Sequence, residues 1–323
     1  MKTALSNTNN FDSDKQLSLY GYDSYFLIFK KLFENNNLPN SILLSGPKGI
    51  GKATFAYHFI NYILSQDEEN HYSLEKFKIN EKNQTYNKIL TNTHPNFYQI
   101  TNLNQEQIKI EQIRNLLKFL SKTTYSKDIK IILIDNLENL NVNSTNALLK
   151  AIEEPKINTF FIIIHNYNCK ILETIKSRCV EFKINFSEYE KKKIFKKLLD
   201  DFNLNSDLDH FNESLYFETP GNLLNFISIL NNSNINEKKD TLSYISFFLD
   251  SYNNKKDTLF LDYASLFIQK FYSDLCNKNL NHLNRYLNNY SKILNEISYS
   301  KKYNLNYKNT LIKVKDILHN EKR

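Results

Sequence analysis

Short apolar runs alternate along the first half of the chain with longer segments whose apolar residues recur at helical spacing. The short runs predict buried strands at 41–45, 97–100, 129–134 and 160–164, and the longer segments predict helices over 18–34, 52–65, 107–120 and 144–152. Strands and helices that alternate in this way favour an α/β fold with a parallel sheet between helices. Ligands of such sheets bind at the carboxyl ends of the strands.

The second half of the chain carries a helical pattern from Ser187 onward. Two breaks interrupt this pattern, Thr219-Pro220-Gly221 and the polar stretch 231–240. Residues 66–93 are polar and weakly periodic, and no element is assigned to them. At roughly 150 residues per domain, the chain has room for two or three domains. The breaks favour three: an α/β domain over 1–183, a small helical domain over 184–231 and a helical domain over 232–323.

Composition excludes several classes of protein. A hydrophobic content of 41% excludes wholesale disorder. The three cysteines, Cys169, Cys179 and Cys276, are too few and too scattered for a disulfide framework or a cysteine-rich zinc site. No apolar run reaches the ~18 residues of a membrane span, and the first residues lack the apolar stretch of a signal peptide. We therefore expect a soluble, cytoplasmic protein with no membrane partner.

Residue usage is strongly biased, with 38 Lys against 4 Arg, 48 Asn and only 5 Gly. In such a chain, the positions that keep Gly or Arg are those where backbone geometry or guanidinium chemistry requires them. The net charge of +7 is spread over both halves of the chain. Composition therefore neither requires nor excludes a nucleic-acid partner.

Three of the five glycines lie in the segment 46–52, with the sequence GPKGIGK. This segment matches the phosphate-loop pattern G-x-x-x-x-G-K and lies between a predicted strand and a predicted helix, which is the context that the pattern needs. The backbone around Gly46, Gly49 and Gly51 would cradle phosphate oxygens, while the Lys52 ammonium would neutralise them. The context disfavours the simpler interpretation, a glycine turn with no ligand.

Two departures from the phosphate-loop pattern affect catalysis. Ala53 stands where a Ser or Thr hydroxyl would bind Mg²⁺, and Thr54, one helical step of ~100° further on, is expected to point elsewhere. After the strand 129–134, Asp135 is placed to hold Mg²⁺ through water, but Asn136 replaces the glutamate that would orient the attacking water. The sequence therefore predicts a degenerate site that leaves binding of ATP or ADP with Mg²⁺ open and hydrolyses ATP weakly or not at all.

Two further segments resemble motifs of the bacterial clamp-loader AAA+ subunits in order and spacing: NALLKAIEEP at 146–155 and TIKSRC at 174–179. A phosphate loop ending in GKAT, His94-Pro95 before a strand, and IEQIR at 110–114 are most similar to the delta-prime subunits of DNA polymerase III. The resemblance is dense from about 41 to 182. Beyond it, Thr219-Pro220-Gly221 resembles the Pro-Gly segment of the family's lid.

The resemblance implies a RecA-like AAA+ P-loop domain, a small helical lid and an all-α collar that assembles five related subunits into an open ring. It implies a stator of the clamp loader, which works with delta and with gamma or tau motor subunits to load the sliding clamp onto primer-template DNA within the polymerase holoenzyme. By the same resemblance, Arg178 would enter a neighbour's ATP site as an arginine finger. The alternative for Arg178 is a surface ion pair.

Other positions depart from the ATP-hydrolysing relatives. Many relatives carry a four-cysteine zinc module after the phosphate loop, and because residues 66–110 contain no cysteine we expect no zinc. Asn222 stands near the position of their lid arginine. His165 and Asn166 end the strand where those relatives have a polar sensor residue. These departures favour a subunit that assists a neighbour's hydrolysis more than its own.

Three alternatives remain at this point. Glu153 and Glu154 are adjacent at a predicted helix end and face different directions, which favours helix-end or interface contacts over a catalytic carboxylate pair. The lysines at 191–193, together with Lys196 and Lys197, form either a solvated helix face or a DNA contact. The rival function is an ATP-hydrolysing AAA+ motor subunit of the gamma or tau kind, or an autonomous AAA+ ATPase.

Overall fold

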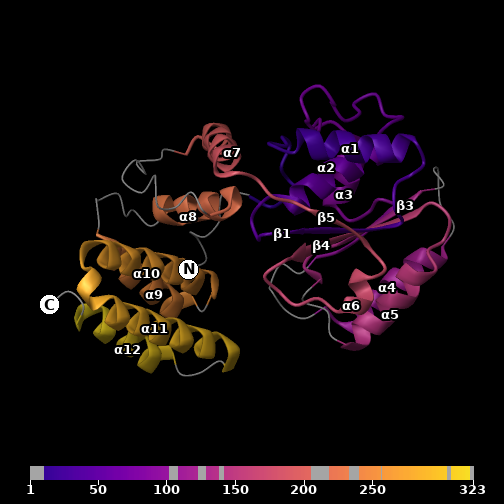
Figure 1. The fold of residues 1–323 in the computed structure, drawn as a ribbon. Coiled ribbons are helices and arrows are strands. Elements are labelled where there is room, and N and C mark those ends of the chain that lie inside the picture. The colour runs from indigo at the N-terminus through magenta and orange to yellow at the C-terminus, as the bar shows by residue number, and fades with distance from the viewer. Residues whose placement is uncertain are drawn as a thin grey trace, which may run out of the picture. The chain divides into compact units, whose positions relative to one another are not determined.

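The computed structural model describes residues 11–101, 108–122, 129–137, 142–204, 218–232, 240–255, 257–303 and 307–320. The chain divides into two units, residues 1–228 and 229–323. The first unit contains an α/β domain followed by helices, and the described part of the second is helical (Figure 1). A separate domain over 184–231 stays a prediction.

Five parallel strands form one sheet in the order β2-β3-β4-β1-β5. The strands are β1 (Ser41–Gly46), β2 (Phe97–Ile100), β3 (Lys130–Ile134), β4 (Thr159–Asn166) and β5 (Val180–Lys183). β1 and β3 are buried along their whole length, which is why their sequences are almost continuously apolar. The register pairs Gly46 with Asn166, so the start of the phosphate loop and the end of β4 lie at the same edge of the sheet.

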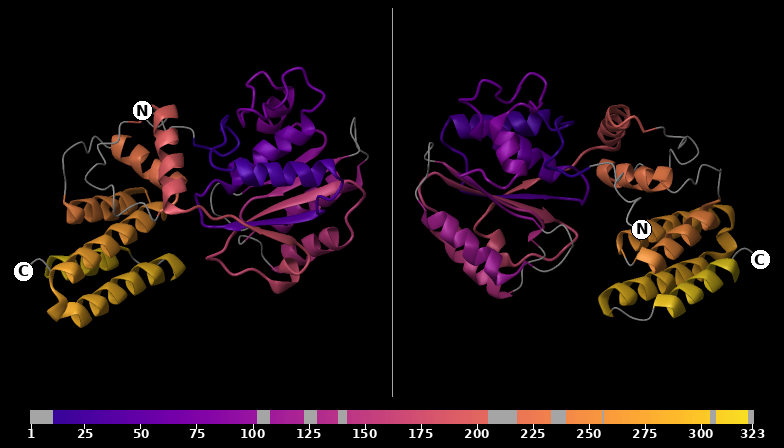
Figure 2. Two further views of the ribbon diagram at one scale, coloured as in Figure 1. Left: turned by 45° about the horizontal axis from the view of Figure 1, so that its top comes forward. Right: turned by 180° about the vertical axis from the view of Figure 1, so that it is seen from behind.

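Helices cover both faces of this sheet (Figures 1 and 2). One face carries α1 (Asp23–Glu34), α2 (Lys52–Leu64) and α3 (Gln84–Leu90), and the other carries α4 (Ile110–Ser121), α5 (Val142–Glu153) and α6 (Glu173–Lys176). The predicted α/β fold with a parallel sheet and a helical C-terminal region is confirmed.

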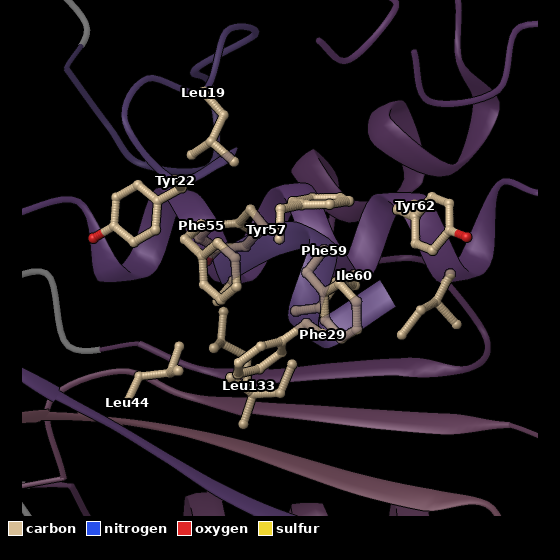
Figure 3. Close-up of a cluster of buried hydrophobic side chains, with 14 of the residues drawn as sticks. Leu19, Tyr22, Phe29, Leu44, Phe55, Tyr57, Phe59, Ile60, Tyr62 and Leu133 are labelled. Atoms are coloured by element: carbon tan, nitrogen blue, oxygen red, sulfur yellow. The ribbon is translucent and has the colours of Figure 1, made fainter. Parts of the chain in front are cut away.

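Aromatic side chains fill the layer between the sheet and the helices α1 and α2 (Figure 3). Phe29, Phe55 and Phe59 are buried there, and the ring of Phe29 meets the other two edge-on at centroid distances of 5.1 and 5.3 Å. Leu44 and Leu133 contribute from the sheet side. Because each such ring buries on the order of 150–250 Å², this layer gives the first turn of α2 a rigid support.

Three local features differ from the sequence pattern. α1 begins at Asp23, not at residue 18, because Gly21 takes a left-handed conformation with φ of +79°. The polar stretch 66–93 contains α3, whose N-cap Asn83 accepts a hydrogen bond from the Tyr86 N–H at 2.7 Å. The pattern also misses the edge strand β5, which is half exposed and therefore lacks a continuous apolar run.

The helices after the sheet are α7 (Glu188–Asp201), α8 (Pro220–Asn232), α9 (Thr241–Lys255), α10 (Leu259–Lys278), the 3₁₀ turn η3 (Leu280–His282), α11 (Leu283–Tyr303) and α12 (Tyr307–Asn320). α7 starts with a capping box between Ser187 and Glu190. In the second unit, Phe248 of α9 is fully buried against rings of α10. Within the described ranges, no helix is both long enough and apolar enough to cross a bilayer.

Candidate nucleotide-binding site

The phosphate loop connects β1 to the first turn of α2. Gly49 and Gly51 have φ values of +79° and +103°, in the left-handed region that favours glycine, and Gly51 is the N-cap of α2. The Lys52 side chain is buried, and its Nζ donates to the carbonyl oxygens of Gly46 and Pro47, each at 2.8 Å. The loop therefore wraps around its own lysine, beside a helix N-terminus that favours anions.

A cavity of about 300 Å³ opens at this loop. This volume is at the lower end of the range for small-molecule sites, roughly 300–1,000 Å³. Its polar lining includes Lys52, Asp135 and Asn166, and Ala53 and Thr54 from the start of α2 line it as well. Its apolar wall comes from Leu19, Ile50, Ile194, Leu198, Pro220 and Leu224. The cavity lining therefore offers both polar groups for phosphates and apolar side chains for a flat base, as a nucleotide needs.

The residues around the Mg²⁺ position fit that ion only partly. Ala53 lines the cavity without a hydroxyl, and Asn136, with φ of +68°, has an amide where a catalytic carboxylate would stand. The helical step turns Thr54 away from Ala53. Thr54 nevertheless lines the cavity, because the cavity extends around the first turn of α2. Asp135 is therefore the one carboxylate among the described residues of the cavity wall.

The two sensor-like residues at the end of β4 lie on opposite faces of the sheet, as alternation along a strand requires. Asn166 lines the nucleotide cavity, and its Oδ1 also accepts a hydrogen bond from the Asn168 N–H at 3.2 Å. His165 is buried and lines a second cavity of about 300 Å³ with Ser45, Lys176 and Lys183. Only Asn166 of this pair therefore faces the candidate nucleotide position.

The N-terminus of α8 rests directly on the phosphate loop. The Thr219 hydroxyl donates to the Lys48 carbonyl at 2.8 Å, and the Gly221 N–H donates to the Gly49 carbonyl at 2.9 Å. A Cβ atom on Gly221 would lie 2.6 Å from the Gly49 oxygen, and one on Gly49 would lie 2.5 Å from side-chain oxygens of Thr219 and Asn222. The two segments touch so closely that glycine is required on both sides.

The segment before α1 completes the cavity wall, which the sequence pattern did not indicate. Tyr20 lines the cavity, hydrogen-bonds to Asp201 of α7 and stacks under the Lys197 ammonium, which is 5.2 Å from the ring centroid. His58 of α2 anchors the same segment, because its Nε2 lies 3.1 Å from the Gln16 carbonyl and its Nδ1 3.0 Å from the Tyr72 hydroxyl. Burial lowers the pKa of His58 to about 3, so the ring stays neutral at physiological pH.

Arg178 lies on the turn between α6 and β5 and is not part of the cavity wall. Its Nε pairs with the Glu153 carboxylate of α5 at 2.7 Å, and its Nη1 donates to the Thr174 carbonyl at 2.8 Å. The side chain is 37% exposed. The ion pair that the sequence left as an alternative is therefore present, and it leaves part of the guanidinium open to solvent.

Cys179, next to Arg178, is unsuited to nucleophilic chemistry. Burial raises the pKa of its thiol to about 11, so the thiolate is scarce at neutral pH. The side chain packs at the edge of the core that includes Ile175 and Ile163. Among the described residues, no three His, Cys, Asp or Glu side chains are grouped closely enough to hold a metal ion.

Comparison with known proteins supplies a family for this arrangement. The delta-prime subunit of DNA polymerase III from Pseudomonas aeruginosa is 33% identical over 143 residues, which are 44% of this chain and 42% of that protein. The gamma subunit from Buchnera aphidicola subsp. Schizaphis graminum is 36% identical over 141 residues, which are 41% of this chain and 38% of that protein. The chain therefore matches less than half the length of these two relatives.

One solved structure is similar to this chain at low identity. The crystal structure of a DNA polymerase III gamma subunit-related protein from Thermotoga maritima covers 93% of this chain and 99% of that chain, with a TM-score of 0.45 and 19% identity. The fold described above rests instead on the sheet order and strand directions of this chain.

The family model described as DNA polymerase III, delta subunit, matches residues 23–188, just over half of the chain. The matched region includes the phosphate loop, NALLKAIEEP and TIKSRC, the segments on which the resemblance to delta-prime subunits rests. The chain belongs to the DNA polymerase III delta subunit family, as a delta-prime-like clamp-loader subunit.

Proposed function

We propose that this chain is a stator of the clamp loader that donates Arg178 to the ATP site of a neighbouring gamma or tau motor subunit. Its partners in this role are the motor and delta subunits and, through the complex, the sliding clamp and primer-template DNA. The observation that carries the proposal is the position of Arg178, on an exposed turn and outside the wall of the chain's own cavity. A guanidinium placed there is available to a second protein.

The surface around Arg178 supports an interface with that neighbour. Leu172 and Val180, which flank the Ser-Arg-Cys turn, are 51% and 47% exposed, and Tyr167 in the preceding loop is 53% exposed. Each of these apolar side chains would bury surface if a partner protein docked beside Arg178. An arginine that loses its water on docking is attracted more strongly to a phosphate group.

The chain's own site supports nucleotide binding with weak hydrolysis. Lys52 and the glycine loop fit ATP or ADP phosphates, and Asp135 would hold Mg²⁺, which supplies charge neutralisation to the phosphates when bound. Ala53 contributes no hydroxyl ligand, and Asn136 has no carboxylate to orient a water. Nucleotide bound here would therefore persist and serve a structural role in a cytoplasmic complex.

The test is ATP turnover by the reconstituted complex with clamp and primed DNA. Arg178→Ala should leave folding and assembly intact and slow hydrolysis at the neighbour's ATP site by about 10³-fold or more, since arginine fingers contribute on the order of 10³–10⁵ in rate. Arg114→Ala, in another helix of the same domain, is the matched control and should have little effect. Wild-type turnover in the Arg178 variant would refute the proposal.

The second candidate is an ATP-hydrolysing motor subunit of the gamma or tau kind. The similarity to a gamma subunit and the intact Lys52 and Asp135 favour it. Turnover by the isolated chain with ATP and Mg²⁺ separates the two candidates, because a stator should be nearly inactive alone. Rapid turnover by the isolated chain would favour the motor despite Ala53 and Asn136.

A further inference from the structure

The Arg178 guanidinium is anchored along one edge. Glu153 pairs with Nε at 2.7 Å, and the Thr174 carbonyl accepts from Nη1 at 2.8 Å. The Ser177 hydroxyl lies 3.4 Å from Nη1 as well. These contacts join NALLKAIEEP, which contributes Glu153, to TIKSRC, which contributes the other three residues, so the two motifs meet at a single side chain.

The anchoring leaves the opposite edge of the guanidinium available. Among the described residues, no partner of Nη2 is present, and 37% of the arginine side chain is exposed. A guanidinium is planar, so contacts at two of its nitrogens fix both its plane and the direction of the third. An arginine without such contacts would sample many rotamers and would have to be ordered on each encounter.

We propose that Glu153 is the positioning residue of the arginine finger: its carboxylate holds Nε so that Nη2 faces the neighbour's ATP. This inference rests on the proposed function, because it assigns a role to Glu153 only if Arg178 acts in trans. Glu153 itself would touch no substrate. It acts by keeping the guanidinium in the orientation that the transferring phosphoryl group requires.

A purely structural role fits the pair poorly. The two side chains are 37% and 43% exposed, and exposed ion pairs add little to stability. Glu153→Gln should therefore leave the unfolding transition of the chain unchanged. The glutamine keeps the size of the side chain and removes the charge that orders the guanidinium.

The experiment compares four variants in the reconstituted complex with clamp and primed DNA: Glu153→Gln, Glu154→Gln, Arg178→Ala and the double variant of Glu153 and Arg178. Glu153→Gln should lower kcat by about tenfold, which is within the roughly 10²-fold that a 1 Å misplacement of a catalytic group can cost, with KM for ATP within about twofold of wild type. Glu154→Gln, at the next and also exposed position, is the control and should match wild type. The double variant should be no slower than Arg178→Ala alone.

Each result that differs from these expectations refutes a specific part of the proposal. If Arg178→Ala turns over normally, the proposed function and this inference both fail. If Arg178→Ala is slow but Glu153→Gln matches or exceeds wild type, the arginine finger stands and the positioning role is refuted. A double variant slower than Arg178→Ala alone would mean that Glu153 acts independently of Arg178, which also refutes it.

Discussion

At the scale of single residues, His58 connects stability to pH. Its ring is fully buried between the Gln16 carbonyl and the Tyr72 hydroxyl, and desolvation holds its pKa at about 3. In the unfolded chain the same ring takes up a proton near its ordinary pKa of 6.5. The folded state therefore binds fewer protons between pH 6.5 and 3, and its stability falls as the pH falls through that window.

The expected loss is about 2 kcal/mol between pH 7 and pH 5, since one pKa unit corresponds to roughly 1.4 kcal/mol. Urea unfolding at the two pH values measures it. His58→Gln should be less stable than wild type at pH 7 and should lose less stability on acidification. An equal loss in both proteins would show that other groups cause the pH dependence. His71, which is exposed, provides the control variant His71→Gln.

At the scale of elements, the contact between the phosphate loop and α8 depends on Gly221. Its Cβ would collide with the Gly49 carbonyl at 2.6 Å, so Gly221→Ala must push α8 away from the loop. We expect a loss of about 1–3 kcal/mol in the free energy of unfolding, the usual cost of overpacking. Thermal or urea unfolding measures it, with Asn231→Ala on the exposed side of α8 as the control.

An unchanged stability in Gly221→Ala would mean that α8 does not rest tightly on the loop in solution. Weaker nucleotide binding in the same variant would be a separate sign that the contact shapes the loop, because Gly49 lies in the cavity wall.

The elements also show how far sequence reasoning reaches. The buried strands β1, β3 and β4 were predictable because burial on both faces gives each of them an apolar run that is not interrupted by polar residues. β5 was not predictable from the sequence, since this half-exposed edge strand pairs through its backbone and needs no apolar run. α3 is held through polar contacts instead: Asn83 caps it, and the Glu68 carboxylate accepts hydrogen bonds from the N–H groups of Gln84 and Thr85.

The candidate site also contains some residues that the sequence indicates and others that it does not. The loop glycines, Lys52 and Asp135 follow a local pattern, so the sequence alone indicates them. Tyr20 and α7 contribute to the cavity wall through packing between residues far apart in the chain. No local sequence pattern predicts such packing. The ion pair between Arg178 and Glu153 also joins residues that are distant in the sequence, so no local pattern predicts it.

At the scale of the whole molecule, the two units have separate cores. Phe248 in the second unit is fully buried, and its ring centroid lies 5.4 Å from that of Tyr263 and 5.8 Å from that of Phe267. Phe248→Ala should destabilise this unit by about 3–5 kcal/mol through the lost contacts and the cavity left behind. The first unit should be affected little, because its core residues are its own.

Differential scanning calorimetry should therefore show one transition of Phe248→Ala shifted down and another close to its wild-type temperature. Phe247, the neighbouring and less buried position, gives the matched control Phe247→Ala, with a smaller shift. A single transition that moves as a whole would show that the two units unfold together.

The backbone contact between Gly49 and Gly221 also constrains how this protein can be recombined with its relatives. A side chain at either glycine collides with the segment that carries the other. A chimera that takes the α/β domain from one clamp-loader subunit and α8 from another would join a loop and a helix that have not evolved together. Functional exchange between such subunits should therefore succeed when the loop and the start of α8 are transferred together.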